Sequence, residues 1–176
     1  MSRSLTIDTS TSQTIVGLIE DGQLLFQSHH EGAMDHGAAV IVLVEQAIKI
    51  GGVVSQVIVG MGPGPFTGLR VGIAFARSYA LARNIPVIGI CSLDAIDIDQ
   101  AEYTVAIDAR RKEIYWARYK DGVRIEGPSV SKPDEVSDYV IGEFPSPEKM
   151  VKLSSVQNFS EPFYLRRPDA VPTAER

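Results

Sequence analysis

The sequence lacks the features of secreted and membrane-spanning proteins. Cys91 is the single cysteine among 176 residues, so no internal disulfide can form and a reducing compartment is predicted. No apolar run approaches the roughly 18 residues that a membrane span requires. The N-terminal Met-Ser-Arg-Ser also lacks the apolar segment of a signal peptide. We therefore expect a cytoplasmic protein with no membrane partner.

An excess of basic residues is also missing. The chain has 17 basic and 22 acidic residues, which gives a net charge of −5. A protein that binds RNA by itself usually carries a basic surface, so direct RNA binding by this chain alone is not expected. The 44% hydrophobic content is typical of a folded globular protein, and the length suffices for one domain or two small lobes.

The most informative segment is a glycine-rich turn. Residues 61–72 read Met-Gly-Pro-Gly-Pro-Phe-Thr-Gly-Leu-Arg-Val-Gly, between an expected strand at 57–60 and an expected helix at 67–83. Such turns often bind phosphate through free backbone N–H groups. Here there is no Gly-Lys-Ser/Thr, and Pro63 and Pro65 each remove an amide donor. The turn is therefore predicted to serve packing or contact.

Residues 5–25 and 105–125 share one pattern. Four anchors coincide without gaps: Ile7, Asp8, Asp21 and Gly22 with Ile107, Asp108, Asp121 and Gly122. Each copy reads as a strand, a polar turn, a second strand (14–19 and 114–119) and an Asp-Gly hairpin turn. Asp-Gly turns are common, so coincidence is the alternative, but the shared register favours a duplication.

We therefore predict an α/β protein with two related lobes, each built on a mixed sheet. The first lobe is placed at residues 1–100 and the second, which is shorter, at 101–176. In the first lobe, apolar periodicity predicts a helix at 38–50 before the 67–83 helix, and a short strand is expected at 87–90.

The remaining elements are expected to be short. A brief helix is predicted at 93–98, and Pro133 favours another that runs to Val140. Prolines interrupt the last third of the chain, so residues 160–176 are predicted to form an extended or loose tail.

The glycine-rich segment resembles the signature of the TsaB family, the accessory subunit of bacterial tRNA threonylcarbamoyladenosine synthesis. Other matching stretches follow in the same order: residues 7–11, 86–89 with 92–93, 106–115 and 164–166. The resemblance covers residues 4–120 well. It implies duplicated RNase H-like lobes of the actin-like, sugar-kinase-like superfamily, with mixed sheets of the five-stranded type.

The resemblance also implies a cleft between the lobes. Nucleotide-binding relatives place phosphate-loop and metal-orienting carboxylates where this chain has Asp8 and Asp108. The expected Asp-x-Gly pattern is absent, so we predict a vestigial cleft with Asp8, Thr9, Ser10 and Asp108 as candidates. Alternatively, both aspartates simply cap their turns. No cofactor is expected to be required, while weak or interface-dependent binding of ATP or ADP stays open.

No catalytic or metal site is predicted. His36 lies six or seven residues from the other histidines, His30 and His29, whereas two metal ligands on one helix face are usually four apart. Cys91 follows an apolar strand and is expected to be inert, and no Gly-x-Ser-x-Gly motif occurs.

A stripe of small residues marks the 67–83 helix, where glycine or alanine recurs every fourth residue from Gly68 to Ala80. The stripe either packs on the chain's own sheet or lets a partner helix approach closely. The resemblance assigns interface roles to this helix and the 38–50 helix. The candidate interface residues are His36, Val40, Leu43, Val44, Phe66, Gly68, Arg70, Gly72, Ala76, Tyr79 and Ala80.

The function implied by the resemblance is that of a non-catalytic subunit. It would dock on and activate a TsaD-like catalytic partner, act with a TsaE-like ATPase, and meet tRNA only through the complex. A homodimer through the same helices is a further expectation. The alternatives are an autonomous ATPase or kinase of the same superfamily and a metallopeptidase of the glycoprotease type.

Overall fold

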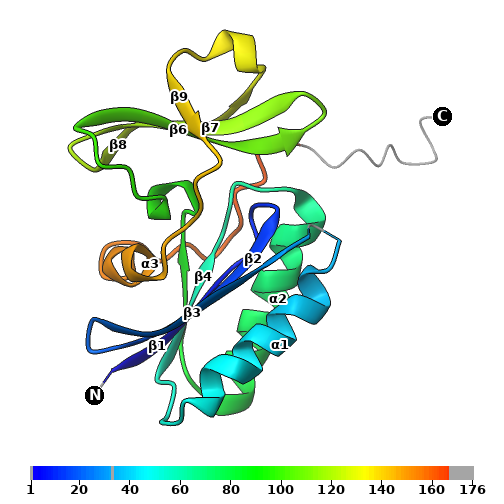
Figure 1. The fold of residues 1–176 in the computed structure, drawn as a ribbon, viewed down its shortest axis with the longest axis vertical. Helices are drawn as coiled ribbons and strands as arrows, with labels where there is room; N and C mark the ends of the chain where they lie inside the picture. The colour runs from blue at the N-terminus through cyan, green and yellow to red at the C-terminus, as the bar shows by residue number, and fades with distance from the viewer. Residues whose placement is uncertain (1, 33, 167–176) are drawn as a thin grey trace, which may run out of the picture.

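The computed structural model describes residues 2–32 and 34–166, which form two lobes, each built on one sheet (Figure 1). The first sheet has five strands in the order β3-β2-β1-β4-β5. These strands are β1 (Arg3–Asp8), β2 (Gln13–Glu20), β3 (Gln23–Glu31), β4 (Gln56–Gly60) and β5 (Val87–Ile90). Strand β1 runs antiparallel to β2 and parallel to β4, so the sheet is mixed.

The second sheet repeats this arrangement with four strands in the order β8-β7-β6-β9. They are β6 (Glu102–Arg110), β7 (Glu113–Lys120), β8 (Val123–Ser131) and β9 (Tyr139–Ile141). Strand β6 runs antiparallel to β7 and parallel to β9, as β1 does with β2 and β4. The predicted duplicated α/β fold is confirmed, and within the described residues the second lobe has no counterpart of β5.

The two Asp-Gly turns that indicated the repeat have the same backbone conformation. The φ angles are 48° and 85° at Asp21 and Gly22, and 49° and 76° at Asp121 and Gly122. Positive φ at both central residues defines the turn whose twist matches a two-residue hairpin. Aspartate tolerates this conformation and glycine favours it, which is why the dipeptide marks both hairpins.

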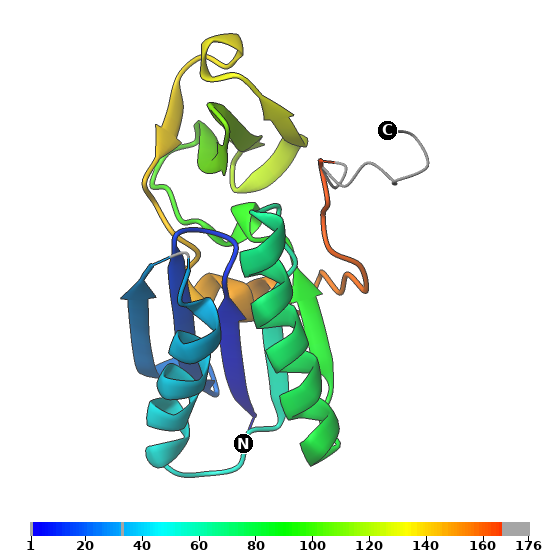
Figure 2. The ribbon, with the colours of Figure 1, turned by 90° about the vertical axis from the view of Figure 1, so that its right-hand side faces the viewer.

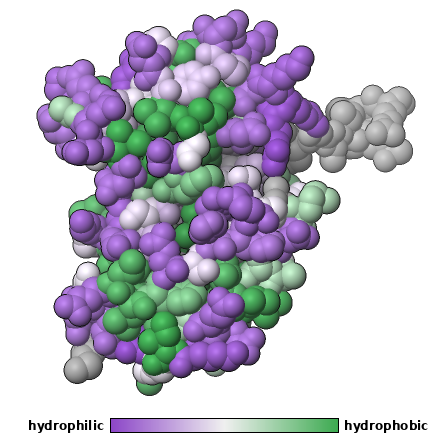
Figure 3. Space-filling view, viewed as in Figure 1, coloured by the Kyte–Doolittle hydropathy of each residue, from purple (hydrophilic) through white to green (hydrophobic). Residues whose placement is uncertain are grey.

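Three helices cover the first sheet (Figure 2). Helices α1 (His36–Lys49) and α2 (Phe66–Arg83) lie on one face and α3 (Pro147–Leu153) lies on the other. The apolar sides of α1 and α2 pack on β1, β2 and β4 and form the largest core. In the view of Figure 3, the outer surface shows hydrophobic side chains in separate patches among hydrophilic ones.

Helix α3 was not predicted, because Pro145 and Pro147 indicated only an interruption. Pro147 occupies the first helical position, where its missing N–H is not needed, and the Ser146 side chain accepts a hydrogen bond from the Lys149 N–H. The predicted helix to Val140 is wrong, because a 3₁₀ turn, η2 (Pro133–Glu135), leads into β9. The predicted helix at 93–98 is reduced to the 3₁₀ turn η1 (Leu93–Ala95).

The chain returns to the first lobe after the second sheet, which differs from the predicted division at residue 100. On α3, Met150 is fully buried against Ile58, Ile90 and Ala95 of the first lobe. Residues 154–166, which we call the C-terminal strap, then run back toward the second lobe (Figure 1). The strap has no helix or strand, in agreement with the predicted tail, while residues 167–176 lie outside the described part.

The C-terminal strap fastens the two lobes together. Its Phe159 N–H donates to the carbonyl of Gly89 at 2.8 Å, and its Phe163 N–H donates to the carbonyl of Met61 at 2.8 Å. Both phenylalanine rings pack against the first-lobe core and against a second cluster, which joins Cys91, Leu93 and Ile96 to side chains of the second sheet. Apolar contacts on two cores at once resist separation of the lobes, because opening them would expose both rings to water.

A buried carboxylate adds a polar connection between the lobes. Asp94 of η1 accepts hydrogen bonds from the Tyr119 hydroxyl at 2.8 Å and from Gln157 Nε2 of the strap at 2.7 Å. Arg124 forms an ion pair with the same carboxylate at 3.4 Å. Burial, together with the nearby Asp94 charge, raises the pKa of Tyr119, so the phenol stays protonated and donates.

Removing the Tyr119 hydroxyl tests this connection. We expect Tyr119→Phe to lower the free energy of unfolding by about 1 kcal/mol, because one buried hydrogen bond is lost while two partners of Asp94 remain. Tyr103→Phe is the matched control, since its ring stacks on Tyr119 at 4.9 Å but its hydroxyl makes no hydrogen bond within the described residues. Urea denaturation measures both; equal losses would show that the hydroxyl of Tyr119 contributes nothing specific.

The packing of α3 on β2 makes a second prediction. A Cβ on Gly17 would lie 2.7 Å from Thr6 Oγ1 and would also collide with Pro147. Gly17→Ala should therefore destabilise the protein by about 1–3 kcal/mol, the usual cost of overpacking. In Gly37→Ala the new methyl meets nothing within 4 Å and alanine favours helix α1, so this control should be neutral or stabilising. Similar denaturation midpoints for the two variants would contradict this packing.

Candidate functional site

The floor of the predicted cleft is closed by hydrogen bonds. Asp8, at the end of β1, is fully buried. Its Oδ1 accepts from the backbone N–H of Ser10 at 2.8 Å and from the Ser10 hydroxyl at 2.6 Å. Its Oδ2 accepts from the Ser92 hydroxyl at 2.7 Å. Both carboxylate oxygens are therefore already engaged by the protein itself.

The surroundings of Asp8 leave no room beside the carboxylate. Gly60 lies against it so closely that a Cβ there would collide with Asp8 Oδ2. The Ser92 hydroxyl also accepts the N–H of Gly62 at 3.1 Å, which ties the glycine-rich turn to the same network. Burial raises the pKa of Asp8, while the hydrogen bonds from Ser10 and Ser92 act in the opposite direction.

Thr9 joins the same loop to helix α2. Its hydroxyl donates to the carbonyl of Gly68 at 2.8 Å and accepts the N–H of Gly72 at 3.1 Å. A Cβ on Gly68 would lie 2.9 Å from the His36 ring, and one on Gly72 would collide with the Thr9 side chain. These two glycines are thus required by close approach of α2 to the N-terminal loop.

The small-residue stripe of α2 therefore faces inward. Gly68, Gly72, Ala76 and Ala80 are all buried. Of the two alternatives, packing within the chain is the observed one, and an exposed helix–helix stripe is wrong. The physical reason is that a helix needs the same small-residue pattern to approach its own sheet as to approach a partner.

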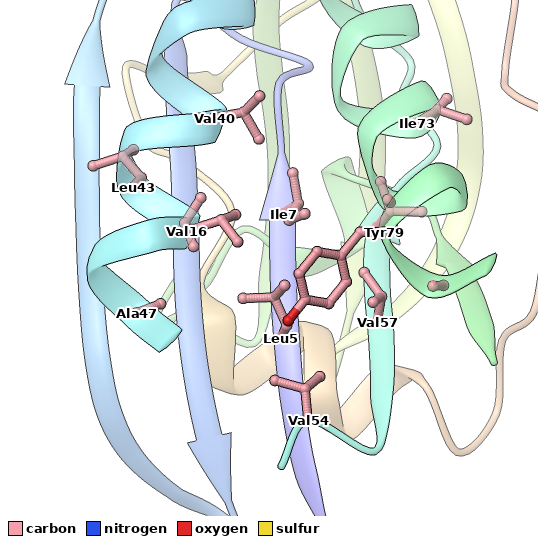
Figure 4. Packing of buried hydrophobic residues seen from close by; sticks show 14 of the residues in the cluster. Leu5, Ile7, Val16, Val40, Leu43, Ala47, Val54, Val57, Ile73 and Tyr79 are labelled. Carbon is pink, nitrogen blue, oxygen red and sulfur yellow. The ribbon is translucent and has the colours of Figure 1, made fainter. Parts of the chain in front are cut away.

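Most of the other candidate interface residues are also buried. Figure 4 shows Val40 and Leu43 of α1 and Tyr79 of α2 facing the strands. His36 and Val44 are buried as well, so within the candidate set only Phe66 and Arg70 are exposed. A direct contact of the buried side chains with a partner is therefore not available, and any interface role of the two helices belongs to their outer faces.

His36 anchors the start of α1 to the sheet. Its Nδ1 and the Thr14 hydroxyl of β2 are hydrogen-bonded at 2.8 Å. Burial lowers the pKa of His36, although the nearby Asp8 opposes this. His36, named from the sequence as a candidate interface residue, therefore makes its contacts inside the protein.

The second-lobe candidate, Asp108, lies apart from the others. Its side chain is 61% exposed and pairs with Arg110 at 3.5 Å. Its Oδ1 also accepts the backbone N–H of Arg110 at 2.8 Å, which is the turn-capping geometry that the sequence left open. The structure thus places Asp8, Thr9 and Ser10 in the interior and Asp108 at the surface of the cleft.

A small cavity remains between the lobes. Its volume is about 130 Å³, whereas sites for small molecules usually measure about 300–1,000 Å³. Asp108 and Arg110 line it from the second lobe, with Glu143 from the loop after β9. Thr11 and Ser12 line it from the first lobe. The sequence did not single out Thr11, Ser12 or Glu143, because the loops that carry them meet only in the tertiary structure.

The described residues contain no cluster of three or more His, Cys, Asp or Glu side chains arranged as metal ligands. His30 and Asp35 approach each other at 3.9 Å on the surface. Burial raises the pKa of the Cys91 thiol to about 12, so it is protonated at neutral pH. In the described part of the chain, no helix is both long and apolar enough to cross a membrane.

The outer faces of α1 and α2 expose apolar side chains. Ile41 and Val42 are exposed on α1, and Phe66 and Leu81 are exposed on α2. The internal contacts of His36 and Thr9 hold both helices on the sheet beneath. The two helices therefore present a fixed face with solvent-accessible apolar groups.

Comparison with known proteins identifies a matching family model and several related proteins. Residues 30–170 match the family model of TsaD, described as tRNA N6-adenosine threonylcarbamoyltransferase. An uncharacterized protein of Mycobacterium tuberculosis is 35% identical, with 99% of this chain and 96% of the relative covered. The tRNA threonylcarbamoyladenosine biosynthesis protein TsaB of Escherichia coli is 33% identical over 129 residues, and 67% of this chain is covered. The chain spans 55% of that protein's length.

Solved structures share the fold. An uncharacterized protein from Pseudomonas aeruginosa with similarity to the peptidase YeaZ superposes with a TM-score of 0.80 at 22% identity. That match covers 94% of this chain and 100% of the solved one. YeaZ from Pseudomonas aeruginosa has a TM-score of 0.75 at 23% identity, with 88% and 91% covered.

The buried carboxyl makes a pH-dependent prediction. Because burial raises the pKa of Asp8 above its ordinary value of 3.8, the native state binds this proton more tightly than the unfolded state. Its contribution to stability is present at low pH and is lost as the pH rises through the raised pKa. Relative to Asp8→Asn, which cannot titrate, the wild-type protein should therefore become less stable as the pH rises.

Urea denaturation of both proteins between pH 4 and pH 8 measures this difference. Asp108→Asn serves as the control, because it removes a carboxylate that is exposed, and it should change the unfolding free energy by less than about 0.5 kcal/mol. A stability difference between wild type and the Asp8→Asn variant that stays constant with pH would contradict the raised pKa of Asp8.

Proposed function

Because the chain belongs to the TsaB family, we propose that it acts in tRNA threonylcarbamoyladenosine biosynthesis as a non-catalytic subunit. Curated relatives from Escherichia coli and Haemophilus influenzae are named for this biosynthesis. The observation that carries the non-catalytic part is the closed floor of the cleft. A carboxylate that orients a metal ion must be accessible to that ion, whereas Asp8 is fully buried and both of its oxygens already accept hydrogen bonds within the protein.

The space between the lobes supports the same proposal. A cavity of about 130 Å³ is less than half the volume of the smallest usual ligand sites. Opening it would require separating the lobes against the contacts of Phe159, Phe163 and the Asp94 carboxylate. We therefore propose that this chain needs no nucleotide of its own, and that any binding of ATP or ADP depends on an interface with a partner.

The outer face of α1 and α2 is the proposed docking surface for a TsaD-like catalytic protein. The family model that this chain matches is that of the transferase itself, so the two proteins share a fold. Related folds can pair through equivalent helices, in the way that identical subunits pair about a two-fold axis. Ile41, Val42 and Phe66 supply exposed apolar area that such a contact would bury.

The outer face of α1 and α2 is a better docking surface than the loops, because internal hydrogen bonds already hold both helices in place. Thr9 fixes the first turn of α2 through Gly68 and Gly72, and Thr14 fixes the first residue of α1. A surface that is already ordered loses little conformational freedom when a partner binds. In this proposal the subunit activates the catalytic protein by ordering it. A TsaE-like ATPase acts on the assembled pair, and tRNA is met only through the complex.

Binding to the catalytic protein tests the proposal. The TsaD-like protein of the same organism is titrated with this chain in a calorimeter, and Val42→Glu is compared with Val123→Glu. Both side chains are exposed valines, but Val123 lies in the second lobe away from the two helices. We expect Val42→Glu to weaken binding at least tenfold (about 1.4 kcal/mol or more), because it places a charge in an apolar contact, and the control to bind normally.

A parallel titration with Mg-ATP separates the alternative functions. Tight nucleotide binding by the isolated chain, without affinity for the catalytic protein, would favour an autonomous ATPase and overturn the proposed function. The metallopeptidase alternative predicts instead a stoichiometric transition metal in the purified protein.

A further inference from the structure

Helix α2 carries arginines that differ from those elsewhere in the chain. Arg3, Arg110, Arg118, Arg124 and Arg166 each pair with a carboxylate. Among the described residues, no carboxylate lies within ion-pair distance of the three arginines of α2, namely Arg70, Arg77 and Arg83. The helix itself contains no acidic residue, although the whole chain has 22 acidic and 17 basic residues.

Two of these arginines flank a groove. Arg70 and Arg77 are seven residues apart, which places them on one side of the helix two turns apart. Between α2 and the C-terminal strap lies a groove of about 490 Å³, lined by both arginines, Ile73 and Ala74 of α2, and Pro162 and Tyr164 of the strap. Two guanidinium groups therefore share this groove with apolar side chains and with the polar Ser78.

Contacts within the protein hold both guanidinium groups in place. Arg70 lies over the Phe66 ring at 4.3 Å, and this ring packs against Tyr164 at 5.1 Å between centroids. Arg77 donates from Nη2 to the carbonyl of Ser160 at 2.6 Å. Neither contact neutralises the charge, so most guanidinium donors stay available for a carboxylate.

Glu161 also lines the groove, on the strap side. It forms no ion pair with Arg70 or Arg77 within 4.0 Å. Two cations against one anion leave a net positive charge in the groove. Arg83 does not line the groove. It lies over the Tyr79 ring in the last turn of α2, and a cation at this end of a helix interacts favourably with the helix dipole.

We propose that this groove receives an acidic segment of the protein partner, with partner carboxylates paired to Arg70 and to Arg77 and apolar side chains on Ala74 and Tyr164. This inference rests on the proposed function and names the chemistry by which that partner is recognised. Arginine and aromatic side chains are enriched in protein interfaces for this combination of charge and apolar contact.

A second copy of this chain fits the groove poorly. Helix α2 has no carboxylate to offer, so pairing two α2 helices would bring arginines toward one another. The acidic residue of α1, Glu45, is already paired with Lys49 at 3.0 Å. The charge pattern therefore disfavours the pairing of two α2 helices and favours a partner that brings its own carboxylates to this face.

RNA phosphate is the other anion to consider. Nucleic-acid surfaces usually combine many cations along a stripe, whereas this groove has two. Ala74, Pro162 and Tyr164 line it with apolar groups and Phe66 packs on Tyr164 beside it, and a phosphate backbone gains little from burying them. The observations thus favour a protein segment.

The test compares Arg70→Gln combined with Arg77→Gln against Arg83→Gln. Binding to the TsaD-like catalytic protein is measured by calorimetry at low and high salt. The double variant should bind at least about tenfold more weakly and show less salt dependence, because the lost contacts are charged. The control should bind within about twofold of wild type.

Loss of the Arg77 hydrogen bond to Ser160 could loosen the strap, so Arg70→Gln is also measured alone. Arg70 makes no hydrogen bond within the described residues, and its single variant should still weaken binding at least about threefold with an unchanged thermal midpoint. If both groove variants bind like wild type while Val42→Glu does not, this inference is wrong and the proposed function stands.

Three further outcomes would overturn the inference. If the wild-type chain does not bind the catalytic protein at all, the proposed function falls with it. If the double variant converts a wild-type homodimer to monomers in sedimentation experiments, the occupant is a second copy. If it abolishes binding of labelled tRNA to the isolated chain and leaves protein binding intact, the occupant is RNA.

Discussion

The buried Asp8 carboxylate is the interaction on which the rest of the structure depends. By accepting from Ser10 and Ser92, it joins the end of β1 to the segment after β5. Ser92 extends this network to Gly62, and the neighbouring Thr9 fixes α2. A carboxylate in this position can either face a ligand or organise the protein around it. Here both of its oxygens accept hydrogen bonds from the protein itself, and the loop that they fix holds helix α2 through Thr9.

Contacts within the protein also hold the two lobes together. The C-terminal strap places Phe159 and Phe163 against the first-lobe core and the cluster that joins the lobes, and Asp94 accepts hydrogen bonds from Tyr119 and Gln157. The two lobes are thus fastened to each other by both apolar and polar contacts. On the outer face of α2, beside the adjoining groove, Arg70 and Arg77 remain without carboxylate partners among the described residues, which is why we propose this groove as the binding site for a partner.

The elements that were predicted well are those specified by local chemistry. Asp21-Gly22 and Asp121-Gly122 require positive φ, so the hairpins of both lobes and their duplication were readable from the chain. Helix α1 was predicted from apolar periodicity and α2 from its place after the glycine-rich turn, both to within two residues at each end. Helix α3 was missed because Pro147 indicated an interruption, although proline is favourable at the first position of a helix.

The sequence by itself determined the family, the two hairpin-based sheets and the absence of a Gly-Lys-Ser/Thr phosphate loop. Only the tertiary structure decided which face of α2 is free, because the stripe from Gly68 to Ala80 suits a sheet and a partner helix equally well. The tertiary structure also decided that the Asp8 carboxylate accepts its hydrogen bonds from within the protein and that Arg70 lies beside Tyr164 of the strap. Those facts depend on contacts between segments far apart in sequence, and no local pattern records such contacts.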